Sequence, residues 1–445
     1  MQPSHVSQSY LPHASDVDRR HPGIRVANIR DLVKVACLSE PREGGSSVQA
    51  RVAESKIPLQ VIGAGPAGMG LVLALCNRIA AAEGKAVQEQ HMLEALQIFE
   101  ASGSPGGKMG HYRVNANTSA HDVVQGIKDG TPFVGVRDDY LQHPQTQSEL
   151  IPLPRIQTLM VEPLVQAMGE FLGERLHCRV DIARIEINEN GIASYDRENH
   201  LRALSTNILF CCGAIETPLP ELLPLQDRWE GSMQFLKRDN LDGLQDSNDP
   251  IVIVGASHSA FSCAWRLLFD PLFAEFARER DIVILQRRER IKLRCSTDFA
   301  SEHQVDYDPE TDVCPRTGLV FFNGGLRKDA KLLYLNIRDG LEKRVRILEM
   351  ERLGEQQDLL DRAGLILQAT GFVANLPQIH KQGEPIRVGN PTQNGELRNL
   401  DDGEIIAGLF GMGLGHNILP QGEPRGEQSF NGGIHGFQSL SLIHI

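Results

Sequence analysis

Two short apolar runs, each followed by small residues and then by a longer apolar stretch, dominate the hydrophobic pattern of the chain. The first run, Leu59 to Ile62, precedes Gly63-Ala64-Gly65-Pro66-Ala67-Gly68. The second run, Ile251 to Val254, precedes Gly255-Ala256-Ser257-His258-Ser259-Ala260. Short apolar runs bounded by glycine are typical of buried parallel strands. The pattern therefore predicts a strand, a tight turn and a helix twice, with the helices over about 66–82 and 258–269.

Weaker apolar runs predict the other elements. A second strand is expected after each helix, near Leu96 to Glu100 and at 282–286. Segments rich in Gly, Asn and Ser at 101–120 and around 129–157 are expected to be loops. Before residue 57 only Ile29 to Cys37 has a helical pattern. The remaining predictions are a helix near 158–176 and strands at 178–187, 206–212, 332–350 and 365–368.

Composition limits the class of protein. The chain has 445 residues, 41% of them apolar, with 42 Gly and 24 Pro, which suits two or three domains with many turns. Its formal charge of −12 argues against nucleic acid or anionic membrane partners, because both need a basic face. No apolar run approaches the roughly 20 residues of a membrane span, and the polar N-terminus is not a secretory signal. We therefore expect a cytoplasmic protein.

The eight cysteines argue against two kinds of site. They form no C-x-x-C pair, and the histidines are not spaced to complete a zinc site. We therefore expect no metal and no dithiol of the kind that reduces disulfides. Four thiols in apolar context are expected to act as small hydrophobic side chains, namely Cys76, Cys211, Cys212 and Cys263.

The first small-residue run has the G-x-G-x-x-G spacing of a dinucleotide-binding turn. Gly63 permits the tight turn, Gly65 lets the backbone approach a pyrophosphate, and Gly68 allows close packing of helix on strand. Phosphates would lie at the helix N-terminus, where free N–H groups and the helix dipole favour negative charge. Glu100 ends the next strand and can accept hydrogen bonds from ribose hydroxyls.

The runs VIGAGPAGMGLVLAL, from Val61, and FEASGSPGGKMG, from Phe99, resemble the FAD-binding half of flavoproteins with two dinucleotide-binding domains. The resemblance implies an FAD site that includes all six residues of the first turn, Gly63, Ala64, Gly65, Pro66, Ala67 and Gly68. It also implies that Glu100 holds the adenosine ribose. The flavin side would be lined by Gly106, Gly107 and Lys108.

The second small-residue run departs from the glycine pattern. It keeps Gly255, whereas Ser257 and Ala260 replace the later glycines. The hydroxyls of Ser257 and Ser259 can donate to phosphate oxygens, and an Ala at the last position is frequent at NADPH sites. His258 lies in the turn itself, where it either touches a phosphate or packs at the start of the helix. The run therefore predicts a second dinucleotide site.

The choice between NADPH and NADH depends on the end of the next strand. Arg287 and Arg288 stand where this fold reads the ribose 2′-position, and guanidinium groups complement a 2′-phosphate. We therefore expect NADPH. The alternative is a solvated basic face, because further basic residues follow at Arg290, Lys292 and Arg294.

Three later segments resemble further motifs of these flavoproteins. Leu209 to Ala214 and Leu367 to Phe372 occupy the positions where the chain crosses between the two domains. The second contains Thr370-Gly371 and resembles the A-T-G-(Y/F) motif of the ornithine and lysine N-monooxygenases. Phe410 to Gly413, with Gly411, resembles the strand that closes the flavin site. It lacks the Asp that reductases carry there, and this departure favours a monooxygenase.

The expected fold is α/β with two Rossmann-like domains, the NADPH-binding domain inserted into the FAD-binding domain. A charged stretch with Pro and Trp at 214–250 marks the first crossing. The expected boundaries are 1–56 for an N-terminal extension, 57–225 for the first part of the FAD domain, 226–350 for the NADPH domain and 351–445 for the second part of the FAD domain.

The resemblance implies an FAD- and NADPH-dependent monooxygenase of the N-hydroxylating group. NADPH would reduce the flavin, and a C4a-hydroperoxide formed with O₂ would pass one oxygen atom to a small nucleophile, in our interpretation an amine. One alternative is an NADPH-dependent flavoprotein reductase or dehydrogenase that inserts no oxygen, and another is a flavin-binding sensor or electron carrier. The implied partners are a small-molecule substrate and O₂, and assembly into a homo-oligomer stays open. The motifs identify no catalytic residue, although His416 and His435 are candidates for proton transfer.

Overall fold

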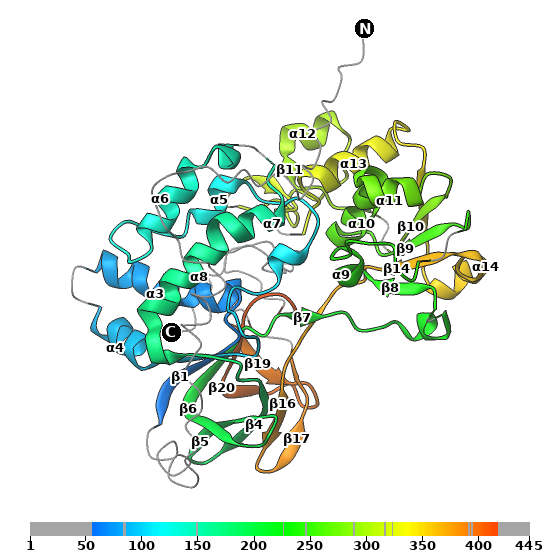
Figure 1. Cartoon of the computed structure of the whole chain (residues 1–445). Helices are drawn as coiled ribbons and strands as arrows, with labels where there is room; N and C mark the ends of the chain where they lie inside the picture. Colours follow the sequence, from blue (N-terminus) through cyan, green and yellow to red (C-terminus); the bar gives the residue numbers. More distant parts are fainter. Residues whose placement is uncertain are drawn as a thin grey trace.

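The computed structural model describes residues 56–416, and the gaps in this range are 83–85, 148–149, 226, 245–246, 288–289, 316, 323, 390–391 and 393–394. Two sheets in this range form two units that the chain links by two crossings (Figure 1). The expected extension up to residue 55, with the helix near 29–37, lies outside the described residues, and so does His435. None of the described helices is long and apolar enough to cross a membrane.

The first unit is built on an 11-stranded sheet with a parallel core. The core strands in spatial order are β3 (Leu176–Cys178), β2 (Gln97–Glu100), β1 (Ile57–Ile62), β6 (Leu201–Phe210) and β20 (Ile405–Gly411). β1 is the central strand because it pairs in parallel with both β2 and β6, so that Ile62 lies opposite Phe99 and Phe210. The carboxyl ends of these strands therefore meet at one edge of the sheet.

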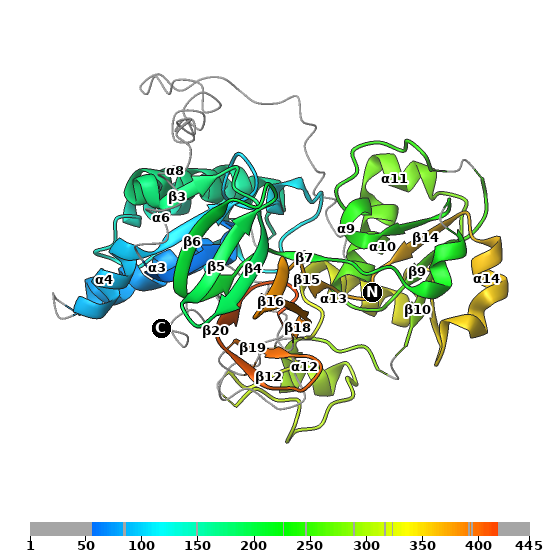
Figure 2. The ribbon, with the colours of Figure 1, turned by 90° about the horizontal axis from the view of Figure 1, so that it is seen from below.

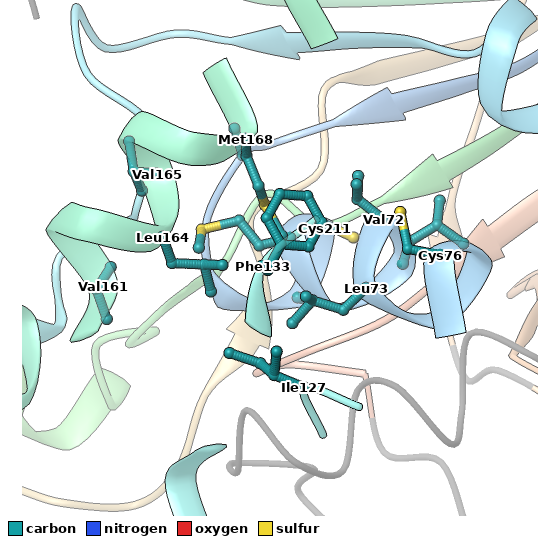
Figure 3. Close-up of a cluster of buried hydrophobic side chains, with 14 of the residues drawn as sticks. Val72, Leu73, Cys76, Ile127, Phe133, Val161, Leu164, Val165, Met168 and Cys211 are labelled. Carbon is teal, nitrogen blue, oxygen red and sulfur yellow. The ribbon is translucent and has the colours of Figure 1, made fainter. Parts of the chain in front are cut away.

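Helices cover one face of this sheet. The apolar side of α3 (Pro66–Ala81) packs on β1, and α8 (Glu162–Leu172) packs on α3. Figure 3 shows part of this cluster, in which Val72 and Leu73 of α3 lie beside Leu164 and Met168 of α8. The smaller helices of the unit are α4 (Val87–Ala95), α5 (Ala120–Val124), α6 (Val134–Gln142), α7 (Leu153–Ile156) and the short turn η1 (Met109–His111).

Further strands, paired antiparallel except for one parallel contact, extend the sheet and cover its other face. Their apolar residues form a second cluster with Ile62 and Phe210 of the core strands. The strands are β4 (Ile182–Asn188), β5 (Gly191–Asp196), β16 (Gln378–Lys381), β17 (Glu384–Ile386), β18 (Val388–Gly389) and β19 (Glu396–Asn399). Both faces of β1 are thus covered, as a parallel core requires.

The second unit has a five-stranded sheet that is parallel throughout. The spatial order is β13 (Val345–Glu349), β10 (Ile282–Gln286), β9 (Ile251–Val254), β14 (Leu365–Gln368) and β8 (Trp229–Gly231). Its helices include α9 (Ser232–Phe235), α10 (His258–Phe269), α11 (Pro271–Phe276), α12 (Thr297–Glu302), α13 (Lys328–Arg338) and α14 (Gln357–Arg362). A small antiparallel pair joins β11 (Cys295–Ser296) to β12 (Leu319–Val320).

The two crossings lie side by side. β7 (Ala214–Ile215) leaves the first unit and β15 (Val373–Ala374) returns to it, and the two pair antiparallel with Ile215 opposite Val373. Figure 2 shows this pair between the two sheets. The crossings expected at 209–214 and 367–372 are thus confirmed to within a few residues.

Three elements differ from the sequence-based expectation. Residues 332–338 belong to helix α13 instead of the expected strand, because Ala330, Leu333 and Ile337 recur at helical spacing and pack in the apolar cluster of the second unit. The expected loop 129–157 contains α6 and α7. The strand β14 pairs with β9 and β8 in the second sheet, whereas the boundary expected at 350 placed it in the FAD domain. Parallel pairing joins distant segments, so the local pattern could not assign this strand.

Candidate dinucleotide sites

The first small-residue run forms a tight turn that leaves no room for side chains. Gly63 has φ +104°, a conformation that residues with a Cβ rarely adopt, and a Cβ there would overlap the backbone carbonyl of Cys211. A Cβ on Gly68 would overlap the carbonyl of Gly63, so helix α3 packs directly on the turn. At Gly65 the nearest atom to such a Cβ is the Cα of Gly107 at 3.7 Å, an ordinary van der Waals contact, so a Cβ would fit there. Gly63 and Gly68 therefore cannot be replaced without a steric overlap, and the roles of the three glycines at a cofactor stay predictions.

Glu100 is tied to this turn. Its Oε2 accepts a hydrogen bond from the backbone N–H of Ala64 at 2.8 Å. Its Oε1 accepts from the backbone N–H and the hydroxyl of Ser102 at 2.9 and 2.7 Å. The carboxylate thus lies at the mouth of the turn, where a ribose could reach it.

The Gly-rich loop after β2 folds back over the turn. The N–H of Gly106 donates to the carbonyl of Ala64 at 2.8 Å. Gly106 and Gly107 have φ values of +102° and +73°, and a Cβ on Gly107 would lie 3.0 Å from the Cδ of Pro66. The structure thus brings Gly107 beside the first turn, while Lys108 is exposed at the start of η1.

The second small-residue run forms an equivalent turn. Gly255 has φ +119°, and a Cβ there would overlap the carbonyl of Ala369. The turn leads into α10, whose N-cap residue Ser257 is exposed and makes no side-chain cap, so that the first N–H groups of the helix are not capped by its hydroxyl. Ser259 lies in the first turn of α10 and is half-buried, whereas Ala260 is fully buried. An anion could therefore reach the start of this helix.

His258 is anchored by the protein itself. Its Nε2 lies 3.1 Å from the carbonyl oxygen of Gly325. Burial, together with the charge of Arg327, lowers the pKa of His258 to about 4. The imidazole is therefore neutral near pH 7, and its contact is the one expected from packing at the helix start. Contact with a phosphate stays a prediction.

Arg287 and Arg288, which we expect to bind the 2′-phosphate of NADPH, follow the end of strand β10. Gln286, the last residue of β10, is buried and donates to Glu349 at 2.8 Å. Arg287 follows it and is exposed, so its guanidinium is accessible to a ligand. Arg288 lies outside the described residues.

A pocket between the two units was not expected from the sequence. It is lined by Val114 to Asn117 from the first unit and by residues of the second, including His258, Trp265 and Arg327 to Ala330. Across it the side-chain amide of Asn115 donates to Asp329 at 2.8 Å. Burial raises the pKa of Asp329. No local motif predicts this pocket, because the residues that line it come from segments far apart in the sequence.

The segments after β14 and at the end of β20 make different contacts. Buried Gln368 donates to the carbonyl of Thr217 at 2.7 Å and to the hydroxyl of Thr370 at 3.0 Å, which fixes the first crossing to the end of β14. Gly371 has φ +104° and open space around it. Gly411 ends β20, and a Cβ there would overlap the ring of His416. The expected roles of Thr370, Gly371 and Gly411 at a cofactor stay predictions.

Solved structures share this fold. Ornithine hydroxylase from Pseudomonas aeruginosa matches with a TM-score of 0.51 and 12% identity, over 88% of this chain and 98% of its own. The FAD-bound cadaverine monooxygenase of the desferrioxamine biosynthetic pathway from Erwinia amylovora matches with a TM-score of 0.52 and 12% identity, over 88% and 94%. L-lysine 6-monooxygenase from Pseudomonas syringae matches with a TM-score of 0.52 and 11% identity, over 87% and 97%.

No family model matches the sequence, and no curated protein matches it. At these low identities the structural likeness shows the fold, which is α/β with two Rossmann-like domains. The second domain is inserted in the first, because β8 to β14 lie between β7 and β15 along the chain.

Proposed function

We propose that the protein is an FAD- and NADPH-dependent monooxygenase that transfers one oxygen atom to a small nucleophile, and that this nucleophile is an amine. The observation that carries the proposal is the repeated turn: Gly63 and Gly255 occupy equivalent backbone environments, each at the end of a strand that pairs in parallel with its neighbours. Two such turns in one chain suit two dinucleotides. The neighbours support the oxygen chemistry, because all three are hydroxylases or monooxygenases of amino acids or amines by name.

The first turn fits the pyrophosphate and ribose of FAD. Helix α3 starts after Gly65 without a side-chain cap, so its first N–H groups are available to phosphate oxygens. The carboxylate of Glu100, held by the N–H of Ala64 in the turn, can accept hydrogen bonds from ribose hydroxyls. When bound there, FAD would supply the hydride acceptor and the reaction with O₂.

The second turn fits the phosphates of NADPH. The N-terminus of α10 offers N–H groups, and Ser257 can add its hydroxyl. Arg287 is exposed at the end of β10, where it would pair with a 2′-phosphate. These residues would hold the cofactor between the two units.

The pocket between the units would hold the substrate. Asp329 lies in it, and the side-chain amide of Asn115 donates a hydrogen bond to its carboxylate. A carboxylate in a partly buried pocket is a strong hydrogen-bond acceptor for the N–H of a neutral amine, which keeps its lone pair for the attack on oxygen. We therefore assign to Asp329 the task of orienting the amine.

The test is product analysis. FAD-loaded protein is mixed with NADPH, isotope-labelled O₂ and a panel of amines, amino acids and aromatic acids, and the product mass is measured. We expect an amine product that carries one labelled oxygen atom. NADPH oxidation without a labelled product would instead indicate a reductase or dehydrogenase, and a protein that binds no FAD would overturn the proposal.

A matched pair of variants tests Asp329. Asp329→Asn removes the carboxylate from the pocket, whereas Asp339→Asn removes one from the exposed end of the same helix. We expect only Asp329→Asn to raise the KM for the amine, by about tenfold or more. Both variants should still reduce FAD with NADPH, and equal KM values would exclude this role.

A further inference from the structure

The short helix α9 connects the two units. Figures 1 and 2 show it on the side of the second unit that faces the first. Just after its end, the carbonyl of Leu236 accepts a hydrogen bond at 2.8 Å from the backbone N–H of Arg113, which belongs to the first unit. The Nζ of the next residue, Lys237, lies over the ring of Tyr112, 4.7 Å from its centroid. The end of α9 is thus in direct contact with the segment that follows the Gly-rich loop of the first turn.

This segment is itself fixed in the first unit. The N–H of Leu153, the first residue of α7, donates to the carbonyl of Val114 at 2.9 Å. The N–H of Ala116 donates to the carbonyl of Ile151 at 2.8 Å. The segment continues from Gly106, which is hydrogen-bonded to the first turn. The position of α9 is therefore linked to the position of that turn.

Glu216 holds the other end of α9. It is half-buried and lies on the first crossing, directly after β7. Its Oε1 accepts a hydrogen bond from the hydroxyl of Ser232, and its Oε2 accepts one from the backbone N–H of Met233 at 3.0 Å. Both donors belong to the start of α9, where backbone N–H groups have no partner within the helix. The carboxylate therefore caps the helix from outside it.

Gly231 leaves the space that this cap needs. It is the N-cap residue of α9, and a Cβ on it would overlap Oε2 of Glu216. Its φ of −71° is one that alanine adopts without strain, so the carboxylate and not the backbone conformation calls for glycine here. Alanine at this position would displace the carboxylate and keep its charge in the molecule.

The second unit anchors both α9 and the crossing. Buried Arg266 of α10 donates to the carbonyl of Phe235, the last residue of α9, at 2.6 Å. The crossing is held beside Glu216, because Gln368 donates to the carbonyl of Thr217 at 2.7 Å. Helix α10 begins at the second dinucleotide turn. Contacts thus run from the second turn through α10 and α9 to the segment beside the first turn.

We propose that Glu216 is a positioning residue that fixes the arrangement of the two dinucleotide sites by holding α9 against the first unit. Hydride transfer between two bound dinucleotides depends on the close approach of the reacting atoms, and a misplacement of about 1 Å can cost about 100-fold in rate. This consequence for catalysis rests on the proposed function, whereas the role of Glu216 at the junction does not.

Hydrogen exchange of the Arg113 amide in the full-length protein tests the junction and needs no turnover, because this amide makes the hydrogen bond between the units. The amides of Gly63 and Gly255 are the reference, since their exchange reports whether the two turns stay folded. We expect Glu216→Ala to speed the exchange of Arg113 by about tenfold or more, with the reference amides within about twofold of the wild type. The matched control is Glu221→Ala, because Glu221 is exposed further along the same linking stretch.

Gly231→Ala tests the same contact from the other side. It should displace the carboxylate and speed the exchange of Arg113 to a similar extent. In the Glu216→Ala background it should add little, because the group that it displaces is gone.

Anaerobic stopped-flow mixing of FAD-loaded protein with saturating NADPH gives the second readout. In the Glu216→Ala variant flavin reduction should be slower by about tenfold or more, while the Kd for NADP⁺ stays within about twofold of the wild type. A change that only destabilised the fold would lower the Tm and leave the rate of the folded protein unchanged.

The proposal is overturned if Arg113 exchanges in the Glu216→Ala variant as it does in the control, or if Gly63 and Gly255 exchange faster together with it. It is also overturned if Gly231→Ala keeps its full effect without the carboxylate, or if flavin reduction keeps its rate while the Arg113 amide opens. A wild-type protein that NADPH does not reduce would contradict the proposed function, and the exchange of Arg113 would still decide the role of Glu216.

Discussion

The two dinucleotide turns repeat the same backbone arrangement in sheets that share no strand. The N–H of Gly63 donates to Phe99 at 2.8 Å, and that of Gly255 donates to Leu285 at 2.9 Å. In each unit the residue after the strand on the opposite side of the turn makes an equivalent hydrogen bond. The N–H of Cys211, after β6, donates to the carbonyl of Ile62 at 2.7 Å, and the N–H of Ala369, after β14, donates to the carbonyl of Val254 at 2.8 Å. Each turn requires a glycine at its first position because a neighbouring backbone carbonyl, that of Cys211 or that of Ala369, excludes a Cβ there.

The turns differ in what surrounds this shared frame. In the first, Gly68 lies against the carbonyl of Gly63, whereas the corresponding Ala260 of the second accommodates a Cβ. Glu100 holds the first turn from the neighbouring strand, whereas Gln286 turns away to Glu349. The shared contacts therefore make a dinucleotide turn, and the contacts that differ would select the ligand.

The largest effect should come from the residues that the turns share. Gly63→Ala and Gly255→Ala each force a Cβ into a carbonyl at a φ of +104° or +119°, and we expect each to cost about 3 kcal/mol or more of folding free energy. Urea unfolding gives the free energy, and flavin absorbance with NADP⁺ titration gives the ligands. The Gly63→Ala variant should lose FAD. The Gly255→Ala protein that still folds should keep FAD but bind NADP⁺ weakly. Loss of the same ligand from both would break the assignment.

Acid should destabilise both units through one buried histidine in each. The pKa of His416 in the first unit and of His258 in the second is lowered to about 4, in both cases mainly by burial. The unfolded chain binds these protons near pH 6.5 and the folded chain does not, so stability is full above pH 6.5 and is lost as pH falls towards 4. Each histidine should contribute up to about 1.4 kcal/mol per pH unit in this window.

Unfolding free energies measured from pH 4 to 7 check this. His258→Asn and His416→Asn should each lower the slope against pH, and His91→Asn, at an exposed site in α4, should leave it unchanged. A slope that no variant changes would show that other groups govern the acid response.

Substitutions at Gly68 and at the corresponding Ala260 should change the free energy of unfolding by different amounts. Gly68→Ala places a Cβ against the carbonyl of Gly63 and should destabilise the protein by about 1–3 kcal/mol. Ala260→Gly removes a buried methyl from a helix and should cost about 1 kcal/mol. Urea unfolding of both variants measures the difference. Gly68→Ala at the stability of the wild type would show that the first turn has the looser packing of the second.

Glu100 should matter for FAD alone. Its carboxylate accepts the N–H of Ala64, so Glu100→Gln keeps an acceptor while Glu100→Ala removes it. We expect FAD to dissociate about tenfold more readily from the Ala variant, with a smaller change for Gln. Fluorescence titration with FAD gives both values, and NADP⁺ affinity is the control that should not change.

The smallest effect should be on the choice of nicotinamide cofactor. Arg287→Ala, alone and with Arg288→Ala, should lower the ratio of kcat/KM for NADPH over NADH, by several-fold for the single change. The matched control is Arg278→Ala, because Arg278 is exposed in the same unit. A ratio near one in the wild type would remove NADPH preference from the proposal.

The sequence by itself determined the two turns and the strands and helices that flank them. The helices expected at 66–82 and 258–269 run over Pro66–Ala81 and His258–Phe269. The glycine at each turn, the strands that flank it and Glu100 at the end of β2 follow from short-range steric and hydrophobic rules. These rules act within a few residues of the chain, so one sequence is enough to apply them.

Only the tertiary structure decided how distant segments meet. It placed β14 in the second sheet, formed α13 from an expected strand and joined Asn115 to Asp329 across the pocket. It also brought Lys237 over the ring of Tyr112. Such contacts join residues far apart in the chain, and their free energy depends on packing and charge in the folded molecule. No local pattern of the sequence carries that information.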